Sequence, residues 1–287
     1  MKLFSVIVTY HPTAQVLERL TETLLAVGVQ VIVVDNTPGG FTTPAGCTGI
    51  SMGGNAGIAK AQNEGVQRAL AAGAEAILFF DQDSTIHDRL VADLTKHLDV
   101  TRPGVIGPLH FDERQGFECP NYVLNRWGYP RQVVSAGRRA PYPVDSRISS
   151  GSLITAPTFA TAGPFDEALF LDYVDIEWCL RARARQVPIL INPSVEMRHT
   201  IGDKAVQTGP LKVFIDGPVR SYYRMRNALL LLRRREVPIL FAFKEIAAEV
   251  VHQTLQLVIA DQRAARFGAL ISGFWHGVIG LGGRYRE

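Results

Sequence analysis

Two carboxylates, Asp81 and Asp83, stand one residue apart directly after the apolar run 76–80. That run has the length and the branched and aromatic content of a strand buried on both faces. In an open parallel sheet, ligands collect beyond the C-terminal ends of the strands, where two acidic side chains can share a hard divalent cation with a substrate diphosphate. An isolated Asp-x-Asp is more often a solvated turn, so this interpretation depends on the rest of the chain.

A second acidic cluster lies in the stretch 170–181. Apolar residues at helical spacing from Val174 onward predict a helix whose first turn carries Asp172 and Asp175. Acidic residues at that position stabilise a helix through its dipole, which is the purely structural interpretation. The functional interpretation is that Asp175 projects into a cleft as a general base, because burial and neighbouring charges tune the pKa of a carboxyl group.

The first hundred residues alternate strands and helices in the order of a parallel sheet. We predict strands at 3–9, 29–34 and 76–80 and helices at 12–27 and 57–72.

Polar residues follow the first two strands, Thr9 and Tyr10 after one and Asp35 and Asn36 after the other. Because such strand ends lie side by side, Tyr10 can cover a base, and Asp35 can accept a hydrogen bond from the base or from a ribose. Each is equally an ordinary strand-end residue.

A glycine-rich loop, 53–57, enters the second predicted helix. Glycines at such a place let the backbone approach a ligand closely, which is a nucleotide-contact signal of moderate strength. The segment is neither the GxGxxG dinucleotide fingerprint nor a GxxxxGK phosphate loop, so hydride transfer and ATP hydrolysis lose support.

The middle of the chain is less regular. We predict strands at 105–108, 148–155 and 195–198, with an irregular connection over 111–145 that is rich in Gly, Pro, Arg and aromatic residues. A loop of that length in a compact domain is usually functional or mobile.

The composition is that of a globular protein from a reducing compartment. Its 287 residues are 47% hydrophobic and 20% charged, with a net charge of +3 and three cysteines far apart. Those cysteines fit neither a disulfide framework nor a zinc site. The N-terminus lacks a signal-peptide pattern, and no stretch reaches the roughly 18 apolar residues of a membrane span. We expect a cytoplasmic protein, or one that rests on the inner face of the cell membrane.

Taken together, these residues resemble the inverting nucleotide-sugar glycosyltransferases of the GT-A fold, glycosyltransferase family 2, and above all its bacterial dTDP-rhamnosyltransferase-like branch. The resemblance covers roughly residues 3 to 235. The matching pieces are Ser5 to Tyr10, Val33 to Asn36, Asn55 to Gly57, Asn63 to Gly65, Asp81 to Asp83, Ser150 and Gly151, Asp172 to Arg181, and His199 to Gly202.

The resemblance implies a GT-A Rossmann-like α/β fold, with a mostly parallel sheet flanked by helices and an α-helical C-terminal extension. It makes Asp175 the catalytic base. It implies donor contacts at Thr9, Tyr10, Asp35, Asn36, Asn55, Gly57, Lys60, Asp81, Gln82 and Arg224. It implies acceptor contacts at Ser150, Gly151, Asp172 and Trp178, and a Mg²⁺ or Mn²⁺ ion held by Asp83 and His199. A lone His such as His199 is more often a packed surface residue.

Arginines are frequent in the predicted helix 220–232 and directly after it. Arg224 and Arg226 can grip the diphosphate of the donor or of a lipid-linked acceptor, or belong to a solvated basic face. The stretch 238–283 predicts amphipathic helices with flanking arginines and a tryptophan. Such helices suit an anionic membrane surface or a second subunit in a homodimer equally well.

We therefore expect a catalytic domain over 1–235, with a nucleotide-binding half (1–100) and an acceptor half (101–235), and a helical extension over 236–287. The expected reaction is transfer of L-rhamnose from dTDP-β-L-rhamnose to a cell-surface polysaccharide or lipid-linked glycan. The alternatives are a UDP-hexose-dependent enzyme of the same fold and a non-catalytic nucleotide-binding protein. Nucleic acid is not an expected partner, because the basic residues come without an RNA-stacking motif.

Overall fold

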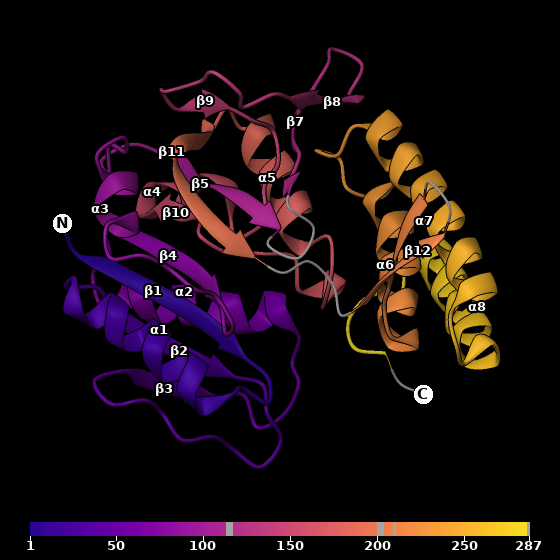
Figure 1. Ribbon diagram of the computed structural model, residues 1–287, viewed down its shortest axis with the longest axis horizontal. Coiled ribbons are helices and arrows are strands. Elements are labelled where there is room, and N and C mark those ends of the chain that lie inside the picture. Colours follow the sequence, from indigo (N-terminus) through magenta and orange to yellow (C-terminus); the bar gives the residue numbers. More distant parts are fainter. Residues whose placement is uncertain (113–116, 200–203, 209–210, 286–287) are drawn as a thin grey trace.

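The computed structural model describes residues 1–112, 117–199, 204–208 and 211–285. A central sheet with helices against it forms the larger part, and three C-terminal helices stand together on one side of it (Figure 1). The predicted combination of an α/β body with a helical C-terminal extension is confirmed.

Among the described residues, the main sheet has nine strands. Their spatial order is β3 (Thr48–Ser51), β2 (Gln30–Asp35), β1 (Leu3–Thr9), β4 (Ala76–Asp81), β10 (Leu153–Thr155), β5 (Val105–Asp112), β11 (Ile189–His199) and β9 (Tyr142–Pro143), with β6 (Phe117–Glu118) paired to β5. β3, β2, β1, β4, β5 and β11 run in one direction, and β10, β9 and β6 run in the other. The sheet is therefore mostly parallel, as predicted.

The helices and the remaining strands surround this sheet. The helices are α1 (Ala14–Ala26), α2 (Ile58–Ala71), α3 (Leu90–Thr95), α4 (Ala156–Ala162), the 3₁₀ helix η1 (Glu167–Leu169), α5 (Val174–Ala184), α6 (Pro218–Leu231), α7 (Ile239–Ile259) and α8 (Arg263–Ile279). Two small hairpins complete the described chain, β7 (Asn121–Leu124) with β8 (Pro130–Val133) and β12 (Lys204–Thr208) with β13 (Leu211–Ile215).

The central strands are apolar throughout because both faces of the sheet are covered. In β1, Val6 belongs to the buried cluster with α2, whereas its neighbour Ile7 belongs to the cluster with α1 and α3. Successive side chains of a strand point to opposite faces, which explains the unbroken apolar runs. Helix α2 lies especially close to β1, because a Cβ on Gly65 would lie 2.5 Å from a methyl group of Val6.

Three local predictions were wrong. Only Leu153–Thr155 of the predicted strand 148–155 is extended, because Gly151 turns the chain with a φ of +73° and the Ser152 amide donates to the Ser149 carbonyl. The connection 111–145, predicted to be irregular, contains the β7–β8 hairpin. Asp172 precedes α5, because a left-handed Tyr173 forms the N-cap of that helix.

The C-terminal helices pack on one another through small residues and polar groups. A Cβ on Gly273 of α8 would lie 2.6 Å from the Tyr222 carbonyl oxygen of α6, so these two helices touch at their backbones. Helix α7 buries three polar side chains, Glu249, Gln253 and Gln256, besides the apolar Phe241 and Ala242, and its outer face is apolar. No helix among the described residues is long and apolar enough to cross a membrane.

Candidate active site

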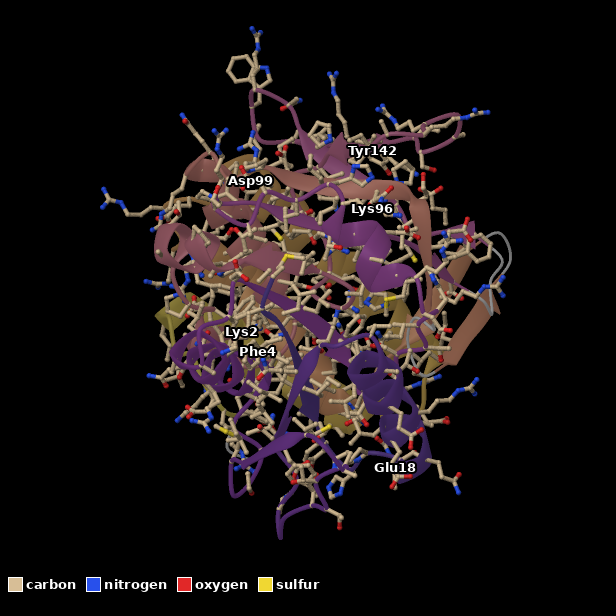
Figure 2. All side chains as sticks on the ribbon, turned by 90° about the vertical axis from the view of Figure 1, so that its left-hand side faces the viewer. Lys2, Phe4, Glu18, Lys96, Asp99 and Tyr142 are labelled. Carbon is tan, nitrogen blue, oxygen red and sulfur yellow. The ribbon has the colours of Figure 1, made fainter. Side chains whose placement is uncertain are left out.

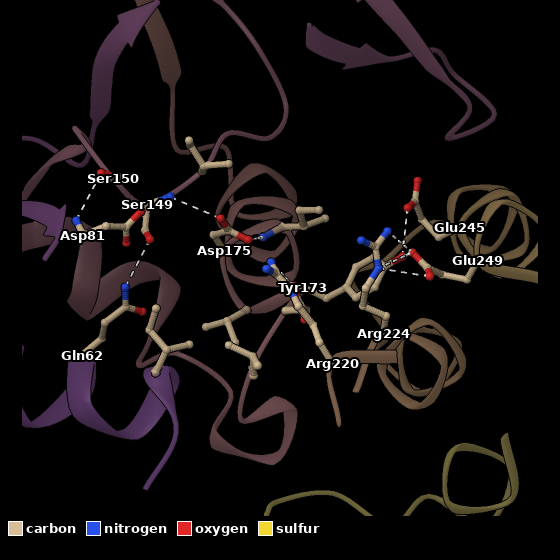
Figure 3. A pocket seen from close by; sticks show the side chains of 16 residues that line it. Gln62, Asp81, Ser149, Ser150, Tyr173, Asp175, Arg220, Arg224, Glu245 and Glu249 are labelled. Atoms are coloured by element: carbon tan, nitrogen blue, oxygen red, sulfur yellow. Dashed lines mark hydrogen bonds and ion pairs between the residues drawn. The ribbon is translucent and has the colours of Figure 1, made fainter. Parts of the chain in front are cut away.

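One pocket is lined by five of the residues that the sequence pattern singled out, namely Asp81, Ser150, Asp172, Asp175 and Arg224. Its volume is about 410 Å³, and its wall comes from α2, the end of β4, the loop 148–150, the segment 171–176 and helices α6 and α7. Asp81 lies at one end, Asp175 between, and Glu245 at the other end (Figure 3). We call these two ends the Asp81 end and the Glu245 end.

The tips of β1 and β2, beside the Asp81 end, are fixed by a buried hydrogen-bond cluster. Thr9 and Asp35 are neighbours in the sheet register, and the Thr9 hydroxyl donates to Asp35 Oδ1 at 2.7 Å. The amide and hydroxyl of Thr37 donate to the same carboxylate at 3.0 and 2.8 Å. Both Thr9 and Asp35 are buried, so they shape the strand ends from within. Their role as donor contacts stays a prediction.

The tip of β1 is tied to the tip of β4 through Tyr10 and Gln82. The Tyr10 amide donates to Gln82 Oε1 at 2.7 Å, and Gln82 Nε2 donates to the Tyr10 carbonyl at 3.2 Å. The Tyr10 side chain is 46% exposed, so its ring is accessible beside the strand ends. The structure thus brings together these two predicted donor residues.

The turn at Ser150 and Gly151 holds the end of β4. The Asp81 amide donates to Ser150 Oγ at 3.2 Å, and the Gly151 amide donates to the Phe79 carbonyl at 2.7 Å. A Cβ on Gly151 would lie 2.9 Å from Met197 Sδ, so only glycine fits this turn. Ser150 and Asp81 both line the pocket.

The loop that enters α2 is shaped by two of the predicted asparagines. Asn36 accepts from the Ala56 amide at 3.1 Å and donates to the Gly57 carbonyl at 3.2 Å, while Asn55 Oδ1 accepts from the Gly57 amide at 3.1 Å. Gly57 has a φ of +89°, and a Cβ there would lie 2.6 Å from the Phe170 ring. These residues therefore determine where α2 begins and how it meets the loop before α5.

Asp81 and Asp83 fit a divalent cation by their chemistry and position. Asp81 is partly exposed at the pocket, and Asp83 is exposed two residues further on. Carboxylate oxygens are ligands of Mg²⁺ and Mn²⁺, and substrate phosphates commonly complete such sites. Among the described residues, no group of three or more His, Cys, Asp or Glu side chains could hold a metal by itself. That the two carboxylates share an ion with a diphosphate stays a prediction.

Asp175 has the environment of a general base. Its Oδ2 accepts from the Ser149 amide at 3.2 Å, and its Oδ1 accepts from the Ile176 amide at 2.9 Å. Burial raises the pKa of Asp175 to about 6; those two hydrogen bonds oppose the rise, and the charges of Asp81 and Asp172 add to it. Such a carboxyl group is ionised at pH 7 yet basic enough to take a proton from a reacting hydroxyl.

The loop before α5, residues 168–173, is held in a strained shape. Phe170, Asp172 and Tyr173 have φ values of +62°, +59° and +63°, a region that costs residues other than glycine on the order of 1 kcal/mol or more each. The buried side chain of Asn227 on α6 donates to three carbonyl groups of the loop, at 2.8, 2.6 and 2.9 Å, those of Leu169, Leu171 and Asp172.

The buried Arg226 supports the same loop. Its Nη2 donates to the carbonyl groups of Ala168 and Leu169 at 3.1 and 2.8 Å, and its Nη1 donates to the Gly283 carbonyl. The Gly283 amide in turn donates to the Ala168 carbonyl at 2.7 Å. Arg226 therefore stabilises the backbone of the loop. From the sequence alone, it is a candidate ligand of a diphosphate or part of a solvated basic face.

Ion pairs build the Glu245 end. Arg220 donates to the Asp172 carboxylate through Nε and Nη2, with a shortest distance of 2.9 Å. Arg224 donates to Glu249 at 2.6 Å through Nη2 and to Asp216 at 3.0 Å through Nη1. Arg224, a predicted donor contact, thus lies at the end away from Asp81, between two buried carboxylates (Figure 3).

The Tyr173 hydroxyl connects the loop before α5 to α7. Its oxygen lies 3.2 Å from Glu245 Oε2 and 3.2 Å from Glu249 Oε1, so the two carboxylates share its single proton. Burial acts to raise the pKa of Glu249, but hydrogen bonds from His252 and Arg224 together with the Arg224 charge lower it to about 2. Glu249 therefore stays ionised at all ordinary pH values, and α7, assigned to a separate extension, forms part of the pocket wall.

Other predicted site residues lie outside the pocket lining. Trp178 is 1% exposed; its ring packs against Phe165 at a centroid distance of 5.2 Å, and its Nε1 donates to the Gly163 carbonyl at 2.9 Å. Trp178 therefore anchors α5 in the core. Lys60 is exposed on α2. His199 ends β11, but its side chain lies outside the described part of the chain, so its predicted role as a metal ligand has no structural counterpart here.

Six polar lining residues were not recognised as site residues in the sequence, namely Gln62, Ser149, Tyr173, Arg220, Glu245 and Glu249. For Glu249 a signal exists, because it is the only Asp, Glu, Lys or Arg in the stretch 246–260. A carboxylate within such a helix has to be paired or functional.

The chain is similar in sequence to known proteins. Glycosyl transferase family 2 matches residues 5–144. The dTDP-rhamnosyl transferase RfbF of Shigella flexneri is 35% identical over 291 residues, covering 99% of this chain and 98% of that protein. The chain belongs to glycosyl transferase family 2. It is accordingly an enzyme that transfers a glycosyl group, as the sequence indicated.

Solved structures share the fold of this family 2 glycosyltransferase. GalNAc-T7, solved with UDP, GalNAc and Mn²⁺, is 12% identical with a TM-score of 0.57; the match covers 88% of this chain and 57% of that one. S. aureus TarS 1-349 is 15% identical with a TM-score of 0.54, covering 97% of this chain and 81% of that one. At these identities the likeness shows the fold alone, and it confirms the predicted GT-A type.

Proposed function

We propose that this family 2 glycosyltransferase moves L-rhamnose from dTDP-β-L-rhamnose, with inversion at the anomeric carbon, onto a cell-surface polysaccharide or lipid-linked glycan. The choice of donor is supported by the 35% identity to a dTDP-rhamnosyl transferase. The mechanism is supported above all by one observation, that Asp81 and Asp175 line the same pocket.

Inversion requires one displacement in line at the anomeric carbon. The diphosphate leaves toward the Asp81 end, and the acceptor hydroxyl attacks from the opposite side, where Asp175 takes its proton. The transition state has oxocarbenium character, with negative charge growing on the leaving phosphate. Proton removal of this kind typically contributes about 10²- to 10⁴-fold to the rate.

Asp83, with Asp81 beside it, would hold a Mg²⁺ or Mn²⁺ ion. A bound ion of this kind supplies Lewis-acid stabilisation of charge on phosphate oxygens and orients the diphosphate. Gln82, Tyr10 and the turn at Ser150 keep the strand ends in place while the donor binds.

The experiment that tests this function is a panel of dTDP- and UDP-sugars with and without Mn²⁺. A ligand that binds only the native state raises the melting temperature, so dTDP-rhamnose with Mn²⁺ is expected to give the largest shift. Hydrolysis of the same compounds to nucleoside diphosphate then reports the chemistry. A larger melting-temperature shift with a UDP-hexose would assign that compound as the donor in place of dTDP-rhamnose. Binding without hydrolysis or transfer would favour a non-catalytic protein.

We further propose that the outer faces of α7 and α8 rest on an anionic membrane surface. Helix α8 exposes Phe267, Ile271 and Trp275, with 57%, 42% and 58% of their surface accessible, on one face. It contains no acidic residue, and a run of three arginines, 233–235, precedes α7. Apolar side chains with flanking arginines suit an anionic bilayer, where each basic residue near the surface contributes about 1 kcal/mol.

Sedimentation with phosphatidylglycerol vesicles tests this contact. The wild type is expected to sediment with anionic vesicles and to be released from them by salt. Trp275→Gln combined with Phe267→Gln is expected to stay in the supernatant. If the wild type does not sediment with the vesicles and light scattering gives twice the mass of the chain, this face joins two subunits and the membrane proposal fails.

A further inference from the structure

The Glu245 end of the pocket lies where an acceptor has to sit. Figure 3 shows Asp175 between Asp81 on one side and Tyr173, Arg220 and Glu245 on the other. If the diphosphate occupies the Asp81 end, an in-line attack brings the acceptor from the Glu245 side. This step depends on the proposed function, and the remaining steps depend on the contacts of the residues themselves.

Glu245 has hydrogen-bonding capacity that its neighbours do not use. Its Oε1 accepts from Lys244 Nζ at 2.7 Å, and its Oε2 accepts from the Tyr173 hydroxyl at 3.2 Å. A carboxylate offers about four acceptor positions. The side chain lines the pocket and is 15% exposed, so its remaining lone pairs are accessible from the cavity.

Arg220 supplies donors in the same pocket. Nε and Nη2 bind Asp172, while Nη1 lies 3.9 Å from Asp216, beyond hydrogen-bond distance. Arg220 also lines the pocket and is 44% exposed. A carboxylate and a guanidinium group in one pocket end offer the acceptors and donors that neighbouring hydroxyl groups of a sugar ring need.

The charge of the pocket disfavours an anionic acceptor group. In the described part of the chain, its lining carries two guanidinium groups, Arg220 and Arg224, and five carboxyl groups, Asp81, Asp172, Asp175, Glu245 and Glu249. Arg224 is already paired with Glu249 and Asp216. A phosphate at this end would meet more negative than positive charge, whereas an uncharged sugar would not.

We propose that Glu245 and Arg220 form an acceptor subsite that hydrogen-bonds the hydroxyl groups of a neutral sugar, so that the enzyme recognises its acceptor by a sugar ring rather than by phosphate. Helix α7, outside the region matched by the family, thereby selects the acceptor.

The test compares two activities of one protein. Hydrolysis of dTDP-rhamnose by water needs no acceptor subsite, whereas transfer to octyl glycosides of neutral hexoses needs it. Glu245→Gln is expected to raise the acceptor KM at least about tenfold, because a hydrogen bond to a charged group is lost. Hydrolysis and the melting temperature are expected to stay at wild-type values. The matched control is Glu18→Gln, because Glu18 is an exposed carboxylate on α1 and is distant from Glu245 in the sequence (Figure 2).

Variants of Arg220 test whether a higher acceptor KM reflects lost acceptor binding rather than a distorted structure. Arg220→Gln, which loses the charge, is expected to raise the acceptor KM, and Arg220→Lys to recover part of it, with donor hydrolysis unchanged in both. An unchanged acceptor KM in Glu245→Gln, or an equal loss of hydrolysis and transfer, overturns the subsite. Transfer to farnesyl phosphate in preference to every octyl glycoside overturns the neutral-sugar assignment. A wild type that hydrolyses none of the nucleotide sugars instead refutes the proposed function itself.

Discussion

The two ends of the pocket are built on different principles. At the Asp81 end, side chains stand on strand tips that the register of the sheet and short hydrogen bonds hold in place, all within the first 85 residues and the turn at Ser150. At the Glu245 end, they come from a strained loop and two helices, joined by ion pairs. The Asp81 end is thus positioned mainly by the backbone of the sheet, whereas the Glu245 end is positioned mainly by side-chain ion pairs.

Asp175→Asn tests the residue where the two ends meet, and we expect it to have the largest effect. Transfer should fall by about 10²- to 10⁴-fold, since the proton acceptor is lost while the shape is kept. The melting-temperature shift with dTDP-rhamnose should persist. Near-normal turnover in this variant would remove Asp175 as the base.

Asp83→Asn removes a proposed metal ligand at the Asp81 end and leaves the residues of the Glu245 end unchanged. Loss of a metal ligand is expected to lower transfer and donor hydrolysis together by about 10²-fold, because stabilisation of the leaving phosphate is worth several kcal/mol. The Mn²⁺-dependent part of the thermal shift should disappear. A control at Asp88, an exposed carboxylate five residues further on, should leave both activities intact.

The pH profile sharpens the comparison, because the pKa of Asp175 is raised to about 6 mainly by burial. The base acts in its ionised form, so kcat/KM should be constant above this pH and fall about tenfold per unit below it. Asp175→Asn should lose that acidic limb. A wild-type profile that is flat down to pH 4.5 would contradict the raised pKa.

Tyr173→Phe perturbs the Glu245 end alone and should have the smallest effect. The hydroxyl that bridges Glu245 and Glu249 is removed, and losing these buried hydrogen bonds costs about 1 to 3 kcal/mol of folding free energy. The melting temperature should fall and the acceptor KM rise a few-fold, with donor hydrolysis unchanged. Tyr129→Phe, at an exposed tyrosine, serves for comparison.

The Asp81 end could be predicted from the sequence because each of its strand ends is marked by neighbouring residues in the chain. Apolar runs followed at once by Thr9, Asp35 and Asp81 place polar groups at the ends of parallel strands, and β1, β2 and β4 were found within a residue of their predicted bounds. The strand predicted at 148–155 is shorter than expected because the chain turns at Gly151. The need for glycine there depends on Met197 and Pro108, which lie against Gly151 only in the folded protein.

The Glu245 end could not be predicted because it is assembled from distant residues. Asp172 and Arg220 are 48 positions apart, and Tyr173 and Glu249 are 76 apart. No spacing rule links such pairs; only the packing of α6 and α7 against the loop does. For the same reason Trp178, in an acidic motif, was placed among acceptor contacts although it fills the core with Phe165.

Residues 283–285 also serve this arrangement. The Gly283 amide donates to the Ala168 carbonyl, and the Tyr285 amide donates to the Tyr223 hydroxyl, so this segment braces the loop before α5. Asp175 follows that loop directly. Deleting residues 283–285 is therefore expected to lower the activity although none of them lines the pocket.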